Sequence, residues 1–415
     1  MKSDLDHLMQ KNDIDALLIT GAGPHNPAMY YLTGGAFLTH ADLIKPVGAA
    51  PTLFHGTMER DEAAKSGLTL KNVADYSYKE LLKEADGDRI LAAALRYKKM
   101  LADVGVTSGR VSLYGKTELN SAFAVFTRLQ KIMPDIELVG EPGGNSVILQ
   151  AMASKDEWEV ERIRKMGKIT TEVVGLTAEY LSTHHAPNGK LVKTDGAFLT
   201  IGDVKRQINF WLAERGAEAP EGFIFAQGRD AGVPHSVGNP DDILETGKTI
   251  IFDIFPCEAG GGYHYDFTRT WSLGYAPDGV ESLYDDVRST YETVMGELKL
   301  NGNNADYQER VCDIYNSLGH KTIREEPALQ EGYIHSLGHG LGLHIHEAPW
   351  FRNKEYATDQ DTLFAGAVMT VEPGLYYPSQ GMGVRLEDTV WVRPDGKMEI
   401  LAEYPLDLVL PVKTG

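Results

Sequence analysis

Cysteine and long apolar runs are both nearly missing from this chain of 415 residues. Its two cysteines, Cys257 and Cys312, cannot form the disulfide framework that holds many small secreted proteins together, so a hydrophobic core must stabilise the fold. The first residues lack the apolar segment of a signal peptide, and no run reaches the roughly 18 apolar residues of a membrane-spanning helix. We therefore expect a cytoplasmic protein that does not enter a membrane.

Positive charge is also scarce. The chain has 40 Lys and Arg residues against 59 Asp and Glu residues, which gives a formal net charge of -19. Binding to DNA or RNA needs a basic surface that neutralises phosphates, so nucleic acid is excluded as a partner. The surplus of carboxylates is compatible with bound cations, which would offset part of this charge wherever the acids cluster.

The length of the chain exceeds the usual size of one hydrophobic core, which predicts two domains. The first part alternates between strands and helices, as an α/β domain does. Its strands are expected at Asp15–Thr20, Pro51–Phe54 and Val111–Tyr114, its helices at Ala94–Ala102 and Ser121–Ile132, and a loop rich in Gly, Pro and Asn up to Gly35.

A long amphipathic helix from Lys155 to about Thr183 follows this alternation. We place the domain boundary before it, between an N-terminal domain of residues 1–153 and a C-terminal domain of residues 154–415. A second helix is expected at Ile201–Arg215, and after Gly222 the pattern predicts strands with short helices between them. The chain as a whole is therefore expected to have an α+β fold.

Two aspartates stand in apolar strands on either side of the glycine-rich turn Gly260–Gly262: Asp253 and Asp266. A charge inside such a strand is costly unless it is paired or bound to a metal. Facing positions of an antiparallel hairpin lie roughly 5 Å apart, where two carboxylates repel each other unless a cation lies between them. The alternative is one exposed aspartate and one aspartate in the turn.

Four of the 13 histidines fall within residues 332–349: His335, His339, His344 and His346. The glycines among them allow a ligand to approach the backbone closely. Taken alone, the cluster fits a zinc site made of several imidazoles. However, the chain has no HExxH helix here, and the glycines disfavour a helix that would align His335 with His339.

Two glutamates repeat the pattern of an acid in an apolar strand. Glu372 precedes Pro373, and Glu387 stands in the sequence R-L-E-D. Such glutamates indicate metal ligands or buried ion pairs. The alternative is a salt-bridge network on the surface, formed with Arg385 and Asp388.

Together these segments bring four carboxylates and one imidazole from successive strands. This donor set suits Mn²⁺, Co²⁺ or Zn²⁺, and four negative charges match two divalent cations. Two such cations can bridge a hydroxide and stabilise a tetrahedral intermediate. The residues therefore predict a two-metal hydrolase, with the ligands Asp253, Asp266, Glu372, Glu387 and one histidine of the cluster.

The ordered motifs resemble those of the pita-bread metallopeptidases, which include methionine aminopeptidase, prolidase and aminopeptidase P. The resemblance covers residues 155 to 405, approximately. It rests on Asp253 with G-Y-x-x-D-x-T-R-T (262–270), H-x-x-G-H-G-x-G (335–342), H-E-x-P (346–349), E-P-G (372–374) and R-x-E-D (385–388). It implies a C-terminal pita-bread fold with a smaller N-terminal α/β domain of the creatinase type.

The resemblance also implies how the five ligands divide between the metals. Asp253 binds one ion, His339 and Glu372 bind the other, and Asp266 and Glu387 bridge the two. Glu372 in addition relays a proton from the bridging water to the leaving amine.

The resemblance also implies that further residues contact the substrate or support the ligands. His346 matches the histidine that stabilises the tetrahedral intermediate, and His235 the one that contacts the substrate. His335 and Arg385 are expected on the substrate side. Thr268 is expected to orient a ligand.

The N-terminal domain distinguishes prolidases, aminopeptidase P and creatinase from methionine aminopeptidases, and Y-L-T-G (31–34) resembles an element of that domain. Creatinase-like members lack the ligands that this chain retains. The resemblance therefore implies a Xaa-Pro dipeptidase or aminopeptidase, in which a hydroxide bridging two metals hydrolyses the bond before proline. It also implies a homodimer and two divalent ions per subunit, with manganese as the first choice and cobalt or zinc as alternatives.

Two departures from the family pattern concern the pocket. Asp253 and Asp266 lie 13 positions apart, two more than is usual, and Phe255 replaces a common glycine. Because side chains alternate with a period of two, an extra pair lengthens the turn without changing the face of the strand. Two alternatives stay open: a non-peptidase hydrolase or lyase on this scaffold, and a non-catalytic binding protein.

Overall fold

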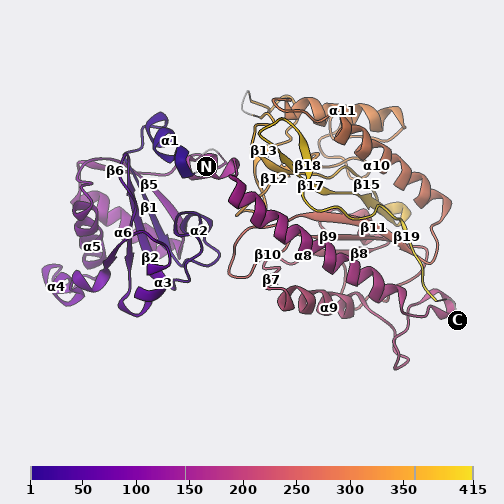
Figure 1. Ribbon diagram of the computed structural model, residues 1–415, viewed down its shortest axis with the longest axis horizontal. Helices are drawn as coiled ribbons and strands as arrows, with labels where there is room; N and C mark the ends of the chain where they lie inside the picture. Colours follow the sequence, from indigo (N-terminus) through magenta and orange to yellow (C-terminus); the bar gives the residue numbers. More distant parts are fainter. Residues whose placement is uncertain (1, 145, 359–360, 414–415) are drawn as a thin grey trace. The chain divides into compact units, whose positions relative to one another are not determined.

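The computed structural model describes residues 2–144, 146–358 and 361–413 and divides into two compact units (Figure 1). The first unit comprises Met1–Met152 with Gly260–Gly262, and the second comprises Ala153–Ala259 with Tyr263–Gly415. That residues 1–153 and 154–415 are separate domains stays a prediction. Among the described residues, the structure has no helix whose length and apolar character would allow it to span a membrane.

The first unit is an α/β structure. Its strands are β1 (Ala16–Gly21), β2 (Ala41–Pro46), β3 (Thr52–His55), β4 (Thr69–Asn72), β5 (Gly109–Lys116) and β6 (Ile136–Val139). Its helices are α1 (Leu5–Lys11), α2 (Pro27–Thr33), α3 (Arg60–Ala64), α4 (Tyr78–Glu84), α5 (Arg89–Asp103), α6 (Leu119–Ile132) and α7 (Val147–Ala153).

These strands form one sheet with the order β4-β3-β2-β1-β5-β6. The central strand β1 is buried along its whole length and pairs antiparallel with β2 and parallel with β5. α5 and α6 cover one face, where Leu18 and Val111 of the sheet pack with Met100 and Leu129 of the helices. The predicted strands and helices of this unit therefore exist, with ends displaced by a few residues.

The predicted loop before Gly35 is wrong, because it contains α2. Pro27 stands in the first turn of this helix, where its missing N–H needs no partner. Gly34 ends the helix with a φ of 73°. All seven helical residues are buried, so tertiary packing outweighs a composition that is typical of loops.

In the part of the chain that the structure describes, the second unit contains four long helices and most of the strands. The helices are α8 (Glu157–Ser182), α9 (Ile201–Glu214), α10 (Asp278–Glu297) and α11 (Asn304–Ser317). The strands are β7 (Ala217–Glu218), β8 (Ile224–Gln227), β9 (Thr249–Ile254), β10 (Cys257–Glu258), β11 (Phe267–Leu273), β12 (His339–Gly340), β13 (Glu347–Trp350), β14 (Val368–Val371), β15 (Gly374–Tyr377), β16 (Met382–Arg385), β17 (Asp388–Val392), β18 (Met398–Ile400) and β19 (Val409–Leu410).

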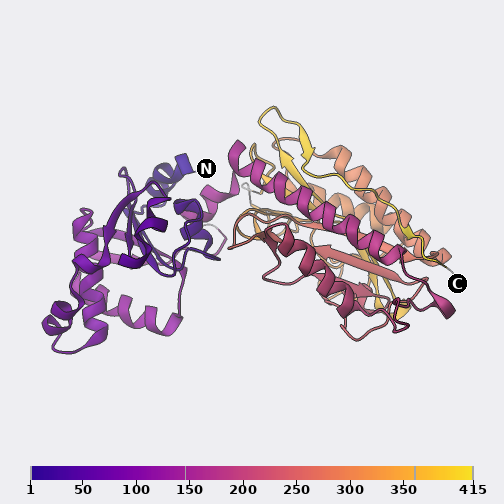
Figure 2. The ribbon, with the colours of Figure 1, turned by 60° about the horizontal axis from the view of Figure 1, so that its bottom comes forward.

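Among the described residues, two larger sheets form the framework of the second unit: β19-β11-β9-β8 and β13-β12-β14-β17-β18. α8 and α9 lie beside each other and pack against the sheet that contains β11 and β8. α10 and α11 share a hydrophobic core with β14 and β17 of the other sheet (Figures 1 and 2). The expectation of short helices after Gly222 is wrong, since α10 has 20 residues and α11 has 14.

α8 confirms the long amphipathic helix that the sequence predicts. The side chain of Asp156 caps its start by accepting a hydrogen bond from the Glu159 amide. The side chain of Glu159 in turn accepts a hydrogen bond from the Asp156 amide, and the two bonds form a capping box. Val160, Ile163 and the other apolar residues of one helical face are buried.

A buried ion pair joins the start of this unit to β13. The ammonium of Lys155 contacts the carboxylate of Glu347, and both side chains are at most 1% exposed. Lys155 also donates a hydrogen bond to the Ala153 carbonyl at 3.1 Å. Removal of either partner would leave an uncompensated charge in the interior.

We expect Lys155→Met to lower the free energy of unfolding by about 3–5 kcal/mol, because it leaves Glu347 buried without its partner. Urea unfolding followed by tryptophan fluorescence measures this loss. Lys168→Met, which removes an exposed lysine of α8, is the matched control. The double variant Lys155→Met/Glu347→Leu should recover most of the stability. If Lys155→Met is as stable as Lys168→Met, the contribution assigned to the buried ion pair between Lys155 and Glu347 is wrong.

Candidate metal centre

The two aspartates lie at the ends of paired strands. Asp253 is in β9, Asp266 is the residue before β11, and both are buried. The register places Thr268 opposite Asp253, so the expectation that the aspartates face each other is wrong. Asp266 lies two positions from Thr268, which returns it to the same face of the sheet. The alternative of an exposed aspartate and a turn aspartate is also wrong.

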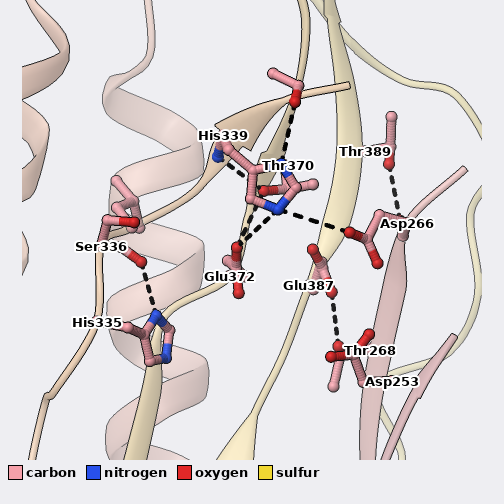
Figure 3. Close-up of polar contacts among 12 residues, drawn as sticks. Asp253, Asp266, Thr268, His335, Ser336, His339, Thr370, Glu372, Glu387 and Thr389 are labelled. Atoms are coloured by element: carbon pink, nitrogen blue, oxygen red, sulfur yellow. Dashed lines mark hydrogen bonds and ion pairs between the residues drawn. The ribbon is translucent and has the colours of Figure 1, made fainter. Parts of the chain in front are cut away.

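His339 of β12 directs its free ring nitrogen at two carboxylates (Figure 3). Its Nδ1 donates to the Gly340 carbonyl at 3.1 Å, which leaves a lone pair on Nε2. That nitrogen lies 3.6 Å from Asp266 Oδ2 and 3.4 Å from Glu372 Oε1. Burial, reinforced by His346, lowers the pKa of His339 to about 3, so the imidazole is neutral. A lone pair that faces two carboxylates is unfavourable unless a cation joins them.

The two glutamates come from the second sheet. Glu372 directly follows β14, and Glu387 directly precedes β17. Glu387 Oε2 accepts a hydrogen bond from Thr268 Oγ1 at 2.6 Å. Its other oxygen, Oε1, is buried and has no hydrogen-bond partner among the described residues, and the same holds for Oδ1 of Asp253. These oxygens are available to a ligand that the protein itself does not supply.

The donor atoms fit a divalent cation. Ligand atoms of Asp266, His339 and Glu387 lie within 4.8 Å of one another. A cation between them would satisfy the lone pair of His339 and the orphaned oxygen of Glu387 together. Carboxylate oxygens with one imidazole form a donor set that suits Mn²⁺, Co²⁺ or Zn²⁺.

Burial changes the pKa values of three of the carboxylates. Burial raises the pKa of Asp266 and of Glu387 well above the ordinary values, and neighbouring carboxylates add to the effect. Burial also raises the pKa of Glu372 to about 8, although the guanidinium of Arg385 opposes this rise. At pH 7 Glu372 therefore holds a proton that a bound cation would displace.

Two arginines are paired inside the protein. Arg385 contacts Asp253 Oδ2 and donates to Tyr376 Oη at 2.8 Å. Arg269 donates to Asp388 Oδ1 at 3.0 Å, and all four charged side chains are buried. The alternative of a surface network between Arg385 and Asp388 is therefore wrong, since each pairs with a distant residue.

The predicted substrate-side residues line one cavity with the predicted ligands. The cavity has a volume of about 440 Å³, and its wall includes the five ligands together with His235, His335, His346 and Arg385. The His346 and His339 rings lie with their centroids 4.3 Å apart. His335 donates from Nδ1 to the Ser336 carbonyl at 2.7 Å and accepts from Tyr376 Oη at 2.8 Å. Both of its nitrogens are thus engaged within the protein.

Several supporting residues were missed from sequence. Thr370 Oγ1 accepts from the His339 amide and donates to Glu372 Oε1 at 3.3 Å, so it links two ligands. Tyr376 connects Arg385 with His335. The sequence feature that could have identified them is a hydroxyl side chain within the apolar segments on either side of E-P-G (372–374). Glu221 also lines the cavity, and no motif marks it.

We expect Glu387→Gln to weaken divalent metal binding by about tenfold or more, because an amide oxygen cannot replace a ligating carboxylate. Equilibrium dialysis against Mn²⁺ followed by elemental analysis measures the bound metal. Glu281→Gln, at an exposed position of α10, is the control. Metal retention equal to that of the control would remove Glu387 from the ligand set.

The raised carboxylate pKa values predict how the stability of the metal-free protein depends on pH. The pKa of Glu372 is about 8 in the folded state against 4.5 as the reference, so the folded protein binds more protons than the unfolded protein in this interval. Stability is therefore lost as the pH rises through the folded value. Above about pH 7.5 the buried histidines are neutral in both states and add nothing.

Thermal unfolding of the chelator-treated protein should accordingly show a melting temperature that falls between about pH 7.5 and 8.5, with a shallower fall in Glu372→Gln. The manganese-loaded protein should lack this fall, because the cation replaces the protons. A melting temperature of the metal-free protein that rises over this range would contradict the interpretation.

Comparison with known proteins identifies the family. Metallopeptidase family M24 matches residues 161–394. The Xaa-Pro dipeptidase of Pyrococcus horikoshii is 26% identical over 396 residues, which cover 94% of each chain. The Xaa-Pro dipeptidase of Pyrococcus furiosus is 28% identical over 400 residues, 95% of this chain and 97% of that one.

A solved structure agrees in fold. The dipeptidase from Pyrococcus horikoshii superposes with a TM-score of 0.74 at 21% identity and covers 98% of this chain and 99% of that one. The predicted pita-bread fold is thereby confirmed. The chain belongs to metallopeptidase family M24 and is a metal-dependent peptidase.

Proposed function

We propose that this metallopeptidase is a Xaa-Pro peptidase of the prolidase or aminopeptidase P type, which hydrolyses the peptide bond before proline. The observation that carries the proposal is a single cavity lined by all five expected ligands and by His235, His335 and His346. Two relatives that align over nearly the whole chain are Xaa-Pro dipeptidases, which supports the choice of substrate.

Five residues would hold two divalent ions in this proposal, with manganese first and cobalt or zinc as alternatives. Asp253 would hold one, His339 and Glu372 the other, and Asp266 and Glu387 both. The orphaned oxygens of Asp253 and Glu387 support this set. When bound, the ions would lower the pKa of water and polarise the scissile carbonyl.

The remaining chemistry falls to side chains of the protein. Glu372, whose carboxylate lies 3.4 Å from Nε2 of His339, can accept a proton from water and pass it to the proline nitrogen as the bond breaks. His346, whose ring lies next to that of His339, can donate a hydrogen bond to the oxygen that becomes negative in the transition state. Arg385 acts through Asp253, whose carboxylate it holds in place.

The cavity is small enough to select short ends of peptides. Its volume of about 440 Å³ lies near the lower end of the range for small-molecule sites. A non-peptidase hydrolase or lyase would use the same metal ligands, so the assay below decides between the two. Membership of a peptidase family leaves the non-catalytic alternative without support. We also propose a cytoplasmic homodimer, by likeness to the family.

The test is hydrolysis of Gly-Pro, Ala-Pro and Ala-Pro-Ala by the manganese-loaded protein. We expect all turnover to stop when the metal is chelated, and His346→Ala to lower kcat by about 10²–10³ while metal content is unchanged. His7→Ala, at an exposed position of α1, is the control. Full metal loading without cleavage of any Xaa-Pro peptide would refute the proposal.

A further inference from the structure

Apolar side chains line the cavity beside the proposed metal ligand Asp253. They are Ile224 of β8, Val237 and Phe255, and all three belong to the wall of the same cavity of about 440 Å³. Phe255 directly follows β9 and is half-buried. None of these side chains has a group that could ligate a metal, so any contact they make is with an apolar part of the substrate.

The backbone fixes Phe255 close to Asp253. Phe255 lies two positions after Asp253, which places both side chains on the same face of the chain, and both line the cavity. Ile224 pairs with Asp253 in the register of β8 with β9. The Phe255 carbonyl accepts a hydrogen bond from Nδ1 of the buried His264 at 3.3 Å. Phe255 is therefore anchored at the Asp253 side of the cavity.

The proposed mechanism decides which part of the substrate meets this wall. Glu372 passes a proton to the proline nitrogen, so the proline lies on the Glu372 side of the metal centre. Figure 3 shows Glu387 between Glu372 and Asp253, which places Asp253 on the opposite side. The Cα of the residue before proline is bonded directly to the scissile carbonyl carbon, so its side chain lies on the Asp253 side.

A second apolar wall supports this assignment. Trp350 of β13 lines the cavity and pairs with His339 in the register of β12 with β13. His339 Nε2 is 3.4 Å from Glu372 Oε1, so Trp350 lies on the side where the proline is expected. The proline ring therefore has an apolar surface of its own, and Phe255 is left to the residue before it.

We propose that Phe255 limits the size of the side chain before proline, so that the enzyme prefers Gly-Pro and Ala-Pro over Leu-Pro and Phe-Pro. This inference rests on the proposed Xaa-Pro peptidase function. The cavity of about 440 Å³ must also hold the proline and the proposed ions, so little space remains for another large group. A methyl group needs little of it, whereas an isobutyl or benzyl group requires that the ring of Phe255 move.

Kinetics of the full-length, manganese-loaded protein test this limit. The kcat/KM for Ala-Pro should exceed that for Leu-Pro by about tenfold or more. In Phe255→Ala the ratio should fall to about twofold or less through a gain for Leu-Pro, and Phe255→Val should give a ratio between the two. Phe210→Ala, which removes an exposed aromatic ring of α9, should keep the wild-type ratio. A wild-type preference for Leu-Pro, or a ratio that survives both substitutions at Phe255, overturns the inference.

Binding of L-alaninol and L-leucinol gives a measurement that needs no turnover, because neither amino alcohol contains a peptide bond. Calorimetry on the zinc-loaded protein should show L-alaninol binding about tenfold more tightly, and Phe255→Ala should abolish this difference. Elemental analysis should find the same metal content in the variant, and a variant that loses metal overturns the inference.

The two measurements separate the inference from the proposed function. If no Xaa-Pro peptide is cleaved but the difference between the amino alcohols depends on Phe255, the proposed function fails and the size limit stands. If peptides are cleaved and the difference survives the substitution, only the inference fails.

Discussion

Repulsion among buried carboxylates is the constraint on which the second unit depends. Asp253, Asp266, Glu372 and Glu387 all line one cavity around Nε2 of His339, although an isolated protein interior disfavours even one such charge. The raised pKa values of three of these acids express that cost. Cations remove it, so the metal-binding and folding equilibria of this unit are linked.

Two buried arginines allow the acids to stay together. Arg385 compensates Asp253 directly. Arg269 acts on the backbone instead: it donates to the carbonyls of Thr268 and Glu387 at 3.0 and 2.8 Å. The two large sheets meet there through a single bridge between Thr268 and Glu387 rather than through a ladder. Arg269 thus adds hydrogen bonds to those that the Glu387 amide and the Thr268 hydroxyl make between the sheets.

Local patterns predict the acids well and their partners poorly. Each proposed ligand lies at or beside the end of a short strand, within a motif of a few residues, so its chemistry can be read in sequence. The partner of Arg385 is not local: the neighbouring Asp388 was the obvious candidate, whereas Asp253 is the partner. The register of the hairpin was not predicted either, since Asp253 pairs with Thr268 and not with Asp266. Glu221 looks like an ordinary turn residue until the cavity is seen.

The longer segment between Asp253 and Asp266 bears on the substrate side more than on the metals. Its strand β10 pairs with β7, and the turn that carries Glu221 follows β7 directly. Glu258 of β10 is held by Arg162 of α8 at 2.9 Å, on an element that supplies none of the ligands. The length of this segment would therefore affect β7 and its turn through the pairing of β10, whereas the face of Asp266 is set by the register of β11 with β9.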